Sequence, residues 1–231
     1  MTYQIKDLID SRNGELYRQI SSKLPIELIA AKDDNWRAET KDGKGIIEWA
    51  STRYPIACFT HELLHLSFDQ RGMGCPGFKV TASVENEKAV HDSVGERLPF
   101  ICNQLIHHKI FQEFIAMGFP SEEFLGESSL DDANNCAKRD LPKLRVLKKK
   151  YPGGLPCKVF VFPYLFLRSP EDNTAESKQL LKELRNLCDQ NFYELGKIIT
   201  ALQQDPKPYI PDYLRKIFVL CDQPEVSFAY V

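Results

Sequence analysis

The feature that most restricts how this chain folds is a pair of histidines, one helical turn apart, on either side of a glutamate. Residues 59–66 read FTHELLHL, so His61, Glu62 and His65 form an HExxH motif inside an apolar stretch. Side chains four positions apart lie on the same face of a helix, so both imidazoles can reach one ion. With five histidines and 17 glutamates in 231 residues, only about 0.008 chance matches are expected.

The residues that flank the motif predict that it lies in the middle of a helix. Pro55 is well placed at the first helical position, where its missing N–H has no partner to lose. Gly72 and Gly74 are expected to stop the helix. We therefore expect a helix from about residue 55 to about residue 70.

Short apolar runs precede this helix and predict a small sheet. The runs cover residues 26–31, 36–40 and 46–50, and Asp42-Gly43 between the last two is a hairpin signal. We expect a mostly antiparallel sheet, packed on the motif helix. Residues 5–24 have the spacing of one helix or two short ones.

Helical spacing returns in the second half of the chain. It predicts a long helix over residues 96–117, stopped by Gly118, and a long helix or a pair over residues 174–202. Residues 158–167 are apolar with Pro163 inside, which leaves an edge strand or a buried helix. Residues 71–96 read as loop with at most one short element, and residues 120–156 favour no single assignment.

These patterns predict an α+β fold that is mainly helical, with a small N-terminal sheet. We expect one domain over residues 1–231. Residues 1–54 would form a helix and the sheet, residues 55–119 the helices of the candidate metal site, and residues 120–231 a mostly helical C-terminal part.

Composition indicates an ordinary soluble protein. Hydrophobic residues make up 43% and charged residues 27%, and the net charge is -2. The first residues lack the apolar core of a signal peptide and no 18-residue apolar run occurs, so we expect a cytoplasmic protein without membrane contact. The seven cysteines are scattered without a CxxC pair, which favours reduced, buried thiols over disulfides or a cysteine-ligated zinc site.

A basic stretch near the middle of the chain raises the question of nucleic-acid binding. Seven basic residues fall within 13 positions: Lys138, Arg139, Lys143, Arg145, Lys148, Lys149 and Lys150. Because the net charge is negative and no aromatic platform is interleaved, we expect a solvated face balanced by acids elsewhere. Nucleic acid is therefore an unlikely partner.

The HExxH motif carries the chemistry. Catalytic zinc commonly takes three protein ligands and a water, and two ligands would come from His61 and His65. Zinc lowers the pKa of its bound water to about 7, so a neighbouring carboxylate can accept the proton. Glu62 stands in the position for this general base.

In this motif and in the strand-rich segment before it, the chain resembles the zincin superfamily of HExxH zinc metallopeptidases. The resemblance implies a zincin-like domain with one zinc ion. It also implies His61 and His65 as ligands, Glu62 as general base, and a peptide or protein substrate lying along the edge strand of the small sheet.

The third ligand is open between several residues. The metzincin extension needs glycine at position 68 and histidine at position 71, where Phe68 and Arg71 stand, so that subfamily is excluded. Gluzincins take a later glutamate. The glutamates at a suitable distance after His65 are Glu85, Glu87 and Glu96. None of them lies within the NExxSD-like string of that group.

Histidines on the second long helix are the other candidates. All five histidines lie between positions 61 and 108, as expected for a metal site built from two helices. We favour His107 as third ligand, with Asn103 one turn earlier as a contact to a ligand or the substrate, and keep His108 as the alternative. Asp69, one turn beyond His65, could orient a histidine.

The sequence thus predicts a zinc-dependent peptidase that uses a metal-activated water with Glu62 as base. The alternative is a zincin-like binding or regulatory protein, whose metal is structural or sensory. Retention of Glu62 favours the peptidase, because a purely structural site closes its fourth coordination position and has no use for a base.

Overall fold

The structure is a computed structural model of the chain. It describes residues 2–74, 78–81, 98–124, 129–151, 155, 157–168, 175–188, 190–221 and 227–230. The chain divides into two compact units, one made of residues 1–74 and 110–129 and the other of residues 75–109 and 130–231. The single-domain organisation stays a prediction, and each unit is described by itself.

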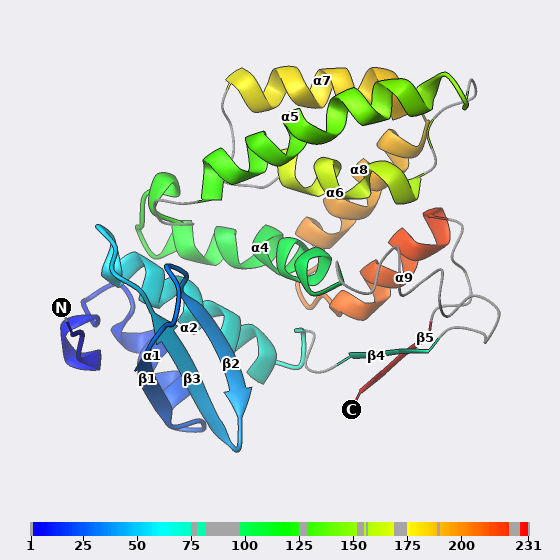
Figure 1. Cartoon of the computed structure of the whole chain (residues 1–231). Coiled ribbons are helices and arrows are strands. Elements are labelled where there is room, and N and C mark those ends of the chain that lie inside the picture. Colours follow the sequence, from blue (N-terminus) through cyan, green and yellow to red (C-terminus); the bar gives the residue numbers. More distant parts are fainter. Residues whose placement is uncertain are drawn as a thin grey trace. The chain divides into compact units, whose positions relative to one another are not determined.

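The first unit combines a small sheet with helices (Figure 1). It begins with the short 3-10 helix η1 (Ile5–Asp7) and helix α1 (Gly14–Ser21), followed by strands β1 (Ile26–Ala30), β2 (Arg37–Lys41) and β3 (Lys44–Trp49). Helix α2 (Pro55–Gln70) carries the HExxH motif. These elements confirm the predicted helix, strand and motif-helix segments.

The sheet is mixed, with strand order β1-β3-β2, so the expectation of a mostly antiparallel sheet was wrong. Strands β2 and β3 form the predicted hairpin, and its Asp42 and Gly43 both have positive φ, 51° and 72°. Strand β1 instead pairs in parallel with β3, placing Ile26 opposite Gly45. The hairpin signal is local, whereas the partner and direction of β1 depend on the packing of the whole sheet.

Helix α2 packs on the sheet and on α1. Gly45 on β3 faces the helix so closely that a Cβ there would lie 2.9 Å from a methyl carbon of Leu66. From the α1 side, the fully buried amide of Asn13 donates to the carbonyl oxygen of Leu8 and to Oγ1 of Thr60, at 2.9 and 2.8 Å. This second contact anchors α2 at the residue before His61.

Helix α4 (Leu98–Ala116) begins in the second unit and ends in the first. Gly118 follows it with φ of 88°, which confirms the predicted stop. The short helix η3 (Ser121–Glu123) then leads to Phe124, whose ring packs on Phe111 and Phe114 at 5.0 and 5.2 Å. An ion pair between Arg71 and Glu113, at 2.9 Å, also joins this half of α4 to the end of α2.

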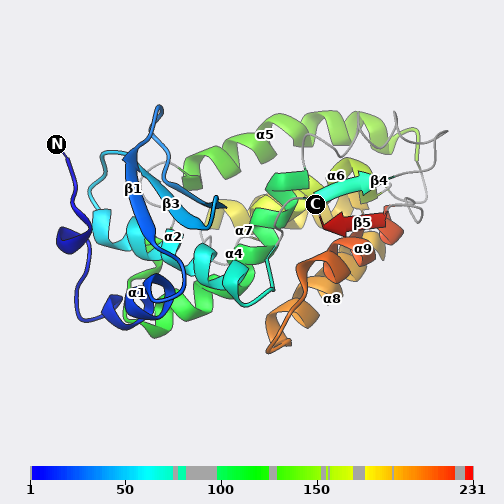
Figure 2. The ribbon, with the colours of Figure 1, turned by 90° about the horizontal axis from the view of Figure 1, so that it is seen from below.

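Where the structure describes it, the second unit is helical apart from one strand pair (Figure 2). Its elements are β4 (Phe78–Thr81), α5 (Ser129–Lys148), α6 (Cys157–Leu167), α7 (Ala175–Cys188), α8 (Gln190–Gln204), α9 (Ile210–Leu220) and β5 (Ser227–Tyr230). Strands β4 and β5 pair in antiparallel fashion although they lie far apart in the sequence. Helices α7 and α8 are the predicted pair.

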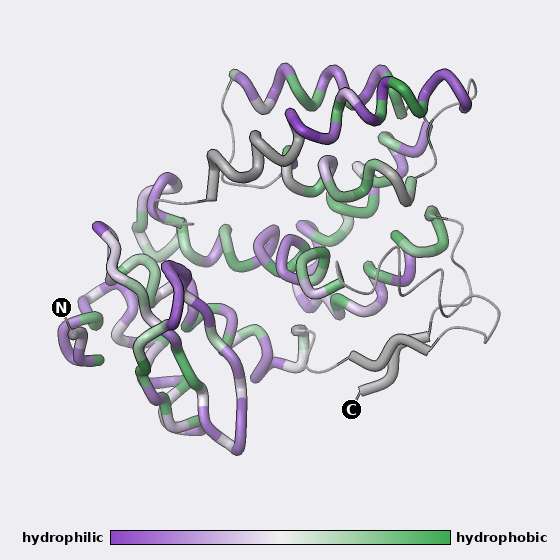
Figure 3. Tube along the Cα trace, in the orientation of Figure 1, coloured by the Kyte–Doolittle hydropathy of each residue, from purple (hydrophilic) through white to green (hydrophobic). Residues whose placement is uncertain are grey.

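Helix α6 resolves the ambiguity over residues 158–167. The segment is a helix despite Pro163, and its side chains are largely hydrophobic (Figure 3). Phe160, Leu165 and Tyr164 are almost completely buried. A helix that is apolar on all sides is expected in the interior of a protein.

The basic stretch lies on and just after α5 and is partly neutralised. Lys138 pairs with Glu176 of α7 at 2.6 Å, and Arg145 pairs with Glu183 of the same helix. The two pairs are seven residues apart on each helix, so they form one seam between α5 and α7. Acidic residues therefore offset part of the basic face, as expected.

Five cysteines are described, and all are buried and reduced: Cys58, Cys102, Cys157, Cys188 and Cys221. This confirms the prediction for those five. Cys75 and the side chain of Cys136 lie outside the described part of the chain. Within that described part, no helix has the length and apolar character needed to cross a lipid bilayer.

Candidate metal centre

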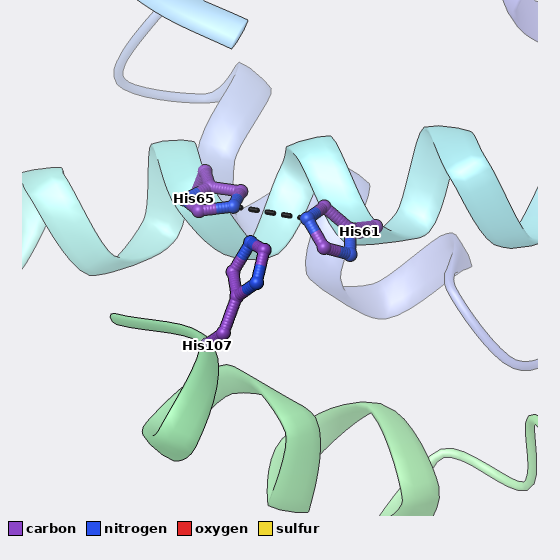
Figure 4. A group of neighbouring side chains, drawn as sticks. All are labelled: His61, His65 and His107. Atoms are coloured by element: carbon purple, nitrogen blue, oxygen red, sulfur yellow. Dashed lines mark hydrogen bonds between the residues drawn. The ribbon is translucent and has the colours of Figure 1, made fainter. Parts of the chain in front are cut away.

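Three histidines converge in the structure: His61 and His65 on α2, and His107 on α4. One ring nitrogen from each lies within 4.8 Å of the others, close enough to hold a metal ion. In Figure 4, His107 projects from α4 toward the two rings on α2. The structure thus brings together the two motif histidines and the favoured third candidate.

Helix α2 sets the spacing of the first two rings. The Nε2 atoms of His61 and His65 lie 3.0 Å apart, and the ring centroids lie 4.8 Å apart. Thr60 fixes the preceding turn, since its hydroxyl donates to the carbonyl of Ile56 at 2.7 Å while accepting from Asn13. Both imidazoles therefore project from one anchored face of the helix.

The end of α4 is held by the same unit that carries α2. The ring of Phe124 packs on His61, with centroids 4.5 Å apart, and on Phe111 of α4. His107 lies one helical turn before Phe111, and Glu113 pairs with Arg71 near the end of α2. Because a helix is a rigid rod over one turn, these contacts also help to position His107.

The spacing of the nitrogens is appropriate for zinc. Two nitrogens bound tetrahedrally at about 2.0 to 2.1 Å from an ion lie about 3.3 Å apart. The His61 and His65 Nε2 atoms, at 3.0 Å, are already near this value. The three candidate ligand nitrogens, one from each histidine, lie within 4.8 Å of one another, so the set is somewhat wider than this tetrahedral spacing.

The two motif histidines are held in the neutral form that binds metals. Burial lowers the pKa of His61 to about 4, while a hydrogen bond with the backbone of Phe124 acts in the opposite direction. Burial also lowers the pKa of His65 well below its usual range, and the neighbouring His61 adds to this effect. A metal ion therefore displaces few protons from these rings at neutral pH.

Glu62 follows His61 on α2 and is buried, with 6% of its surface exposed. Burial raises the pKa of its carboxyl to about 8, and the charge of Arg37 and a hydrogen bond from the backbone of Ala38 partly oppose this rise. A divalent cation nearby would favour the ionised form further. Glu62 is therefore a carboxyl group whose pKa lies well above the usual range of glutamate.

The hydrogen bond from Ala38 comes from the open edge of the sheet. In a hairpin with a two-residue loop, the residues that close the loop, here Lys41 and Lys44, form a hydrogen-bonded pair. Alternate positions of β2, Thr40 and Ala38, then present their backbone groups away from β3. Glu62 thus accepts a hydrogen bond from an outward-facing N–H group of the edge strand.

The remaining candidates lie outside the three-histidine cluster. His108 is 1% exposed, and its Nδ1 lies 3.3 Å from the side-chain nitrogen of Gln203 on α8. Burial lowers the pKa of His108 to about 3, helped by the charge of Arg168. Asn103 is half-buried on α4, one turn before His107.

Asp69 is half-buried one turn beyond His65. Its Oδ1 lies over Gly74, where a Cβ would come within 1.7 Å of it. Burial raises the pKa of Asp69 to about 6. The glutamates considered as third ligands, Glu85, Glu87 and Glu96, lie outside the described residues.

Sequence patterns pointed to neither Arg37 nor Ala38. Ala38 acts through its backbone, which carries no signature in residue type. Arg37 interacts electrostatically with Glu62 and pairs with Asp33 and with Glu48. The one available signal was the edge position of this strand next to the motif helix.

Comparisons with known proteins add no family to these observations. Searches of protein-family models, of curated proteins and of solved structures each found no match to the chain.

Proposed function

We propose that this protein is a zinc-dependent metallopeptidase of zincin type. His61, His65 and His107 hold one zinc ion, and Glu62 is the general base. The observation that supports this most strongly is the convergence of three ring nitrogens within 4.8 Å, with the buried Glu62 next to His61 in the chain.

Zinc is the ion that best matches this set of groups. Three imidazoles without a thiolate are typical of catalytic zinc sites, which keep a fourth position open. Imidazole also binds copper, iron and nickel, so three histidines limit the metal to this group of ions. Which of these ions is bound then depends also on the metals available in the cell. Bound zinc would polarise a carbonyl oxygen and make water acidic at neutral pH.

Glu62 supplies the proton transfer. Ionised Glu62 accepts a proton from the attacking water and delivers it to the nitrogen of the leaving amine. The N–H of Ala38 holds the carboxylate, so the base does not rotate freely between these two positions. Burial raises the pKa of the Glu62 carboxyl toward neutrality. A carboxyl with a pKa in this range is an efficient proton acceptor and donor.

The edge of the sheet supplies a way to align a peptide. Within the described part of the chain, strand β2 pairs with β3 on one side only. An extended substrate chain could add to the open side through main-chain hydrogen bonds, next to Glu62. This alignment would hold one particular peptide bond of the substrate at the metal. The substrate class is therefore a peptide or an extended protein segment.

A second candidate is a zincin-like binding or regulatory protein with a structural metal. The burial of the site favours it: His61, Glu62 and His107 are exposed by only 7%, 6% and 4%. A catalytic site must admit a substrate, whereas a structural site is closed. His65, which is half-buried, is the most accessible of the three histidines.

Replacing Glu62 by glutamine separates the two functions. The peptidase proposal predicts that Glu62→Gln keeps zinc but loses hydrolysis of a fluorogenic peptide library by a factor of about 100 or more. The control is Glu122→Gln, an exposed glutamate in η3, which should behave as the wild type. Zinc-loaded wild-type protein that cleaves no member of the library would favour the structural metal.

A further inference from the structure

A groove in the second unit shares no lining residue with the metal cluster and has the features of a ligand site. It runs between α6 and α8 and has a volume of about 490 Å³. This size is within the range of small-molecule sites. Its lining comes from Tyr164, Arg168, Phe192, Tyr193, Gly196, Lys197, Thr200, Ala201 and Gln204.

Aromatic rings form the apolar part of the groove. Tyr164 of α6 is 1% exposed, and its ring meets Phe192 edge-on, with centroids 5.0 Å apart. Phe192 in turn meets Tyr193 edge-on at 6.1 Å. The rings of Phe192 and Tyr164 are fixed by one another, so they offer rigid surfaces to a flat apolar group.

Gly196 keeps the groove open above the hydroxyl of Tyr164. A Cβ at this position of α8 would lie 3.3 Å from that hydroxyl oxygen, which is tighter than ordinary contact. Glycine is less favourable than alanine inside a helix, so its place in the middle of α8 is consistent with the need for space. The phenol therefore lies at the floor of the groove below a position without a side chain.

Among the described residues that line the groove, two are cations and none is an acid. Arg168, exposed at the end of α6, forms a hydrogen bond with the hydroxyl of Tyr164, and this opposes the rise in the pKa of that phenol caused by burial. Lys197 pairs with Glu194 at 2.9 Å, so its charge is partly compensated. Arg168 is thus the main anion-binding group, and its planar guanidinium can bind a carboxylate or phosphate through two hydrogen bonds.

We propose that this groove binds a small aromatic anion. The carboxylate or phosphate of the ligand lies on Arg168 and the hydroxyl of Tyr164, and its ring lies against Phe192 and Tyr193. Thr200 and Gln204 supply further polar contacts at the rim. The site requires neither the metal nor Glu62, so the test of this proposal does not depend on the peptidase proposal.

Calorimetric titration of the full chain tests this proposal with four probes: benzoate, phenyl phosphate, the neutral benzamide and inorganic phosphate. Benzoate or phenyl phosphate should saturate one site, with benzamide and inorganic phosphate at least about tenfold weaker. Benzoate against phenyl phosphate then shows which anionic group the site prefers. The titrations are run with and without zinc and should agree.

Variants locate the binding. Arg168→Gln should weaken binding of the better probe by about tenfold or more, and Gly196→Leu should abolish binding by filling the groove. Arg215→Gln is the matched control, because Arg215 is an exposed arginine of α9 outside the groove. Thermal melting of each variant by circular dichroism verifies that it folds.

Three results would overturn the proposal. One is the absence of saturable binding of either aromatic anion, and another is equal affinity for benzoate and benzamide. The third is unchanged affinity of a folded Arg168→Gln protein. Equal affinity for phenyl phosphate and inorganic phosphate would also contradict the proposal, because it would show that the ring of the ligand contributes nothing to binding.

Discussion

Glu62 accepts a hydrogen bond from the backbone N–H of Ala38, which joins the glutamate between the two motif histidines to the edge strand of the sheet. The N–H comes from a position of β2 that faces away from β3, so the sheet loses no ladder bond in making this contact. The orientation of the proposed base therefore depends on the strand that would align the substrate.

Proline at position 38 removes this N–H without breaking the ladder, since proline is tolerated on an edge strand where the N–H faces outward. We expect Ala38→Pro to keep its zinc but to lose about tenfold or more in kcat, because Glu62 is no longer held. Thr40→Pro is the matched control, as it removes the next outward N–H of the same strand. Equal loss of kcat in both variants would mean that the contact with Glu62 has no role.

Asp69 should make stability depend on pH. Burial raises its pKa from 3.8 to about 6 in the folded chain, so the folded state binds the proton more tightly than the unfolded state. Its ionisation therefore destabilises the fold: stability is highest below pH 3.8 and is lost as pH rises through about 6. Asparagine at this position remains neutral.

Urea unfolding of metal-free protein measures this effect. Asp69→Asn should be more stable than the wild type at pH 8, by about 2 kcal/mol, and nearly equal to it at pH 4. Asp34→Asn, at an exposed loop position, is the control and should show no comparable dependence. A difference that is the same at both pH values would show that burial of the charge is not its cause.

Gly45 sets the distance between β3 and α2. A Cβ there would lie 2.9 Å from Leu66 and 3.0 Å from Leu24, so Gly45→Ala should reduce the free energy of unfolding by about 1 to 3 kcal/mol. At Gly14 a Cβ would meet ordinary contact at 3.6 Å, and Gly14→Ala should be neutral or slightly stabilising. Chemical denaturation compares the two. A fully stable Gly45→Ala protein would show that the two leucines rearrange freely.

The motif helix was the most predictable element because its signals are local. Pro55 at the first turn and the glycines after Gln70 mark its ends, and α2 begins and ends where they indicate. The hairpin is similar, since Asp42-Gly43 specifies a turn with two positive φ values. The parallel pairing of β1 was not predictable in this way, because it depends on which strand becomes central.

Helix α5 shows why local signals fail elsewhere. Its sequence is polar, and Pro142 lies inside it, so propensity alone disfavours a helix. The ion pairs of Lys138 and Arg145 with α7 supply support that comes from distant residues. The pairing of β4 with β5 is likewise non-local.

The third histidine of the cluster shows the same difference between local sequence signals and packing of distant segments. His107 and His108 are neighbours on one helix whose faces are both apolar, and both are buried. Residue spacing favoured His107 but left His108 as an alternative, because the helix face of each is apolar. The placement of α4 decides it: His107 joins the cluster, and His108 lies against Gln203. Sequence alone thus predicted the pair on α2 and favoured His107, while setting His108 aside required the fold.

The zinc content of purified protein, measured by elemental analysis with alanine variants of the histidines, tests the central claim most directly. We expect one zinc per chain in the wild type and in His108→Ala, a matched buried histidine of the same helix. His61→Ala, His65→Ala and His107→Ala should each bind zinc at least about 100-fold more weakly while remaining folded by circular dichroism. Folded wild-type protein that contains no zinc and takes up none when zinc is added would contradict the account.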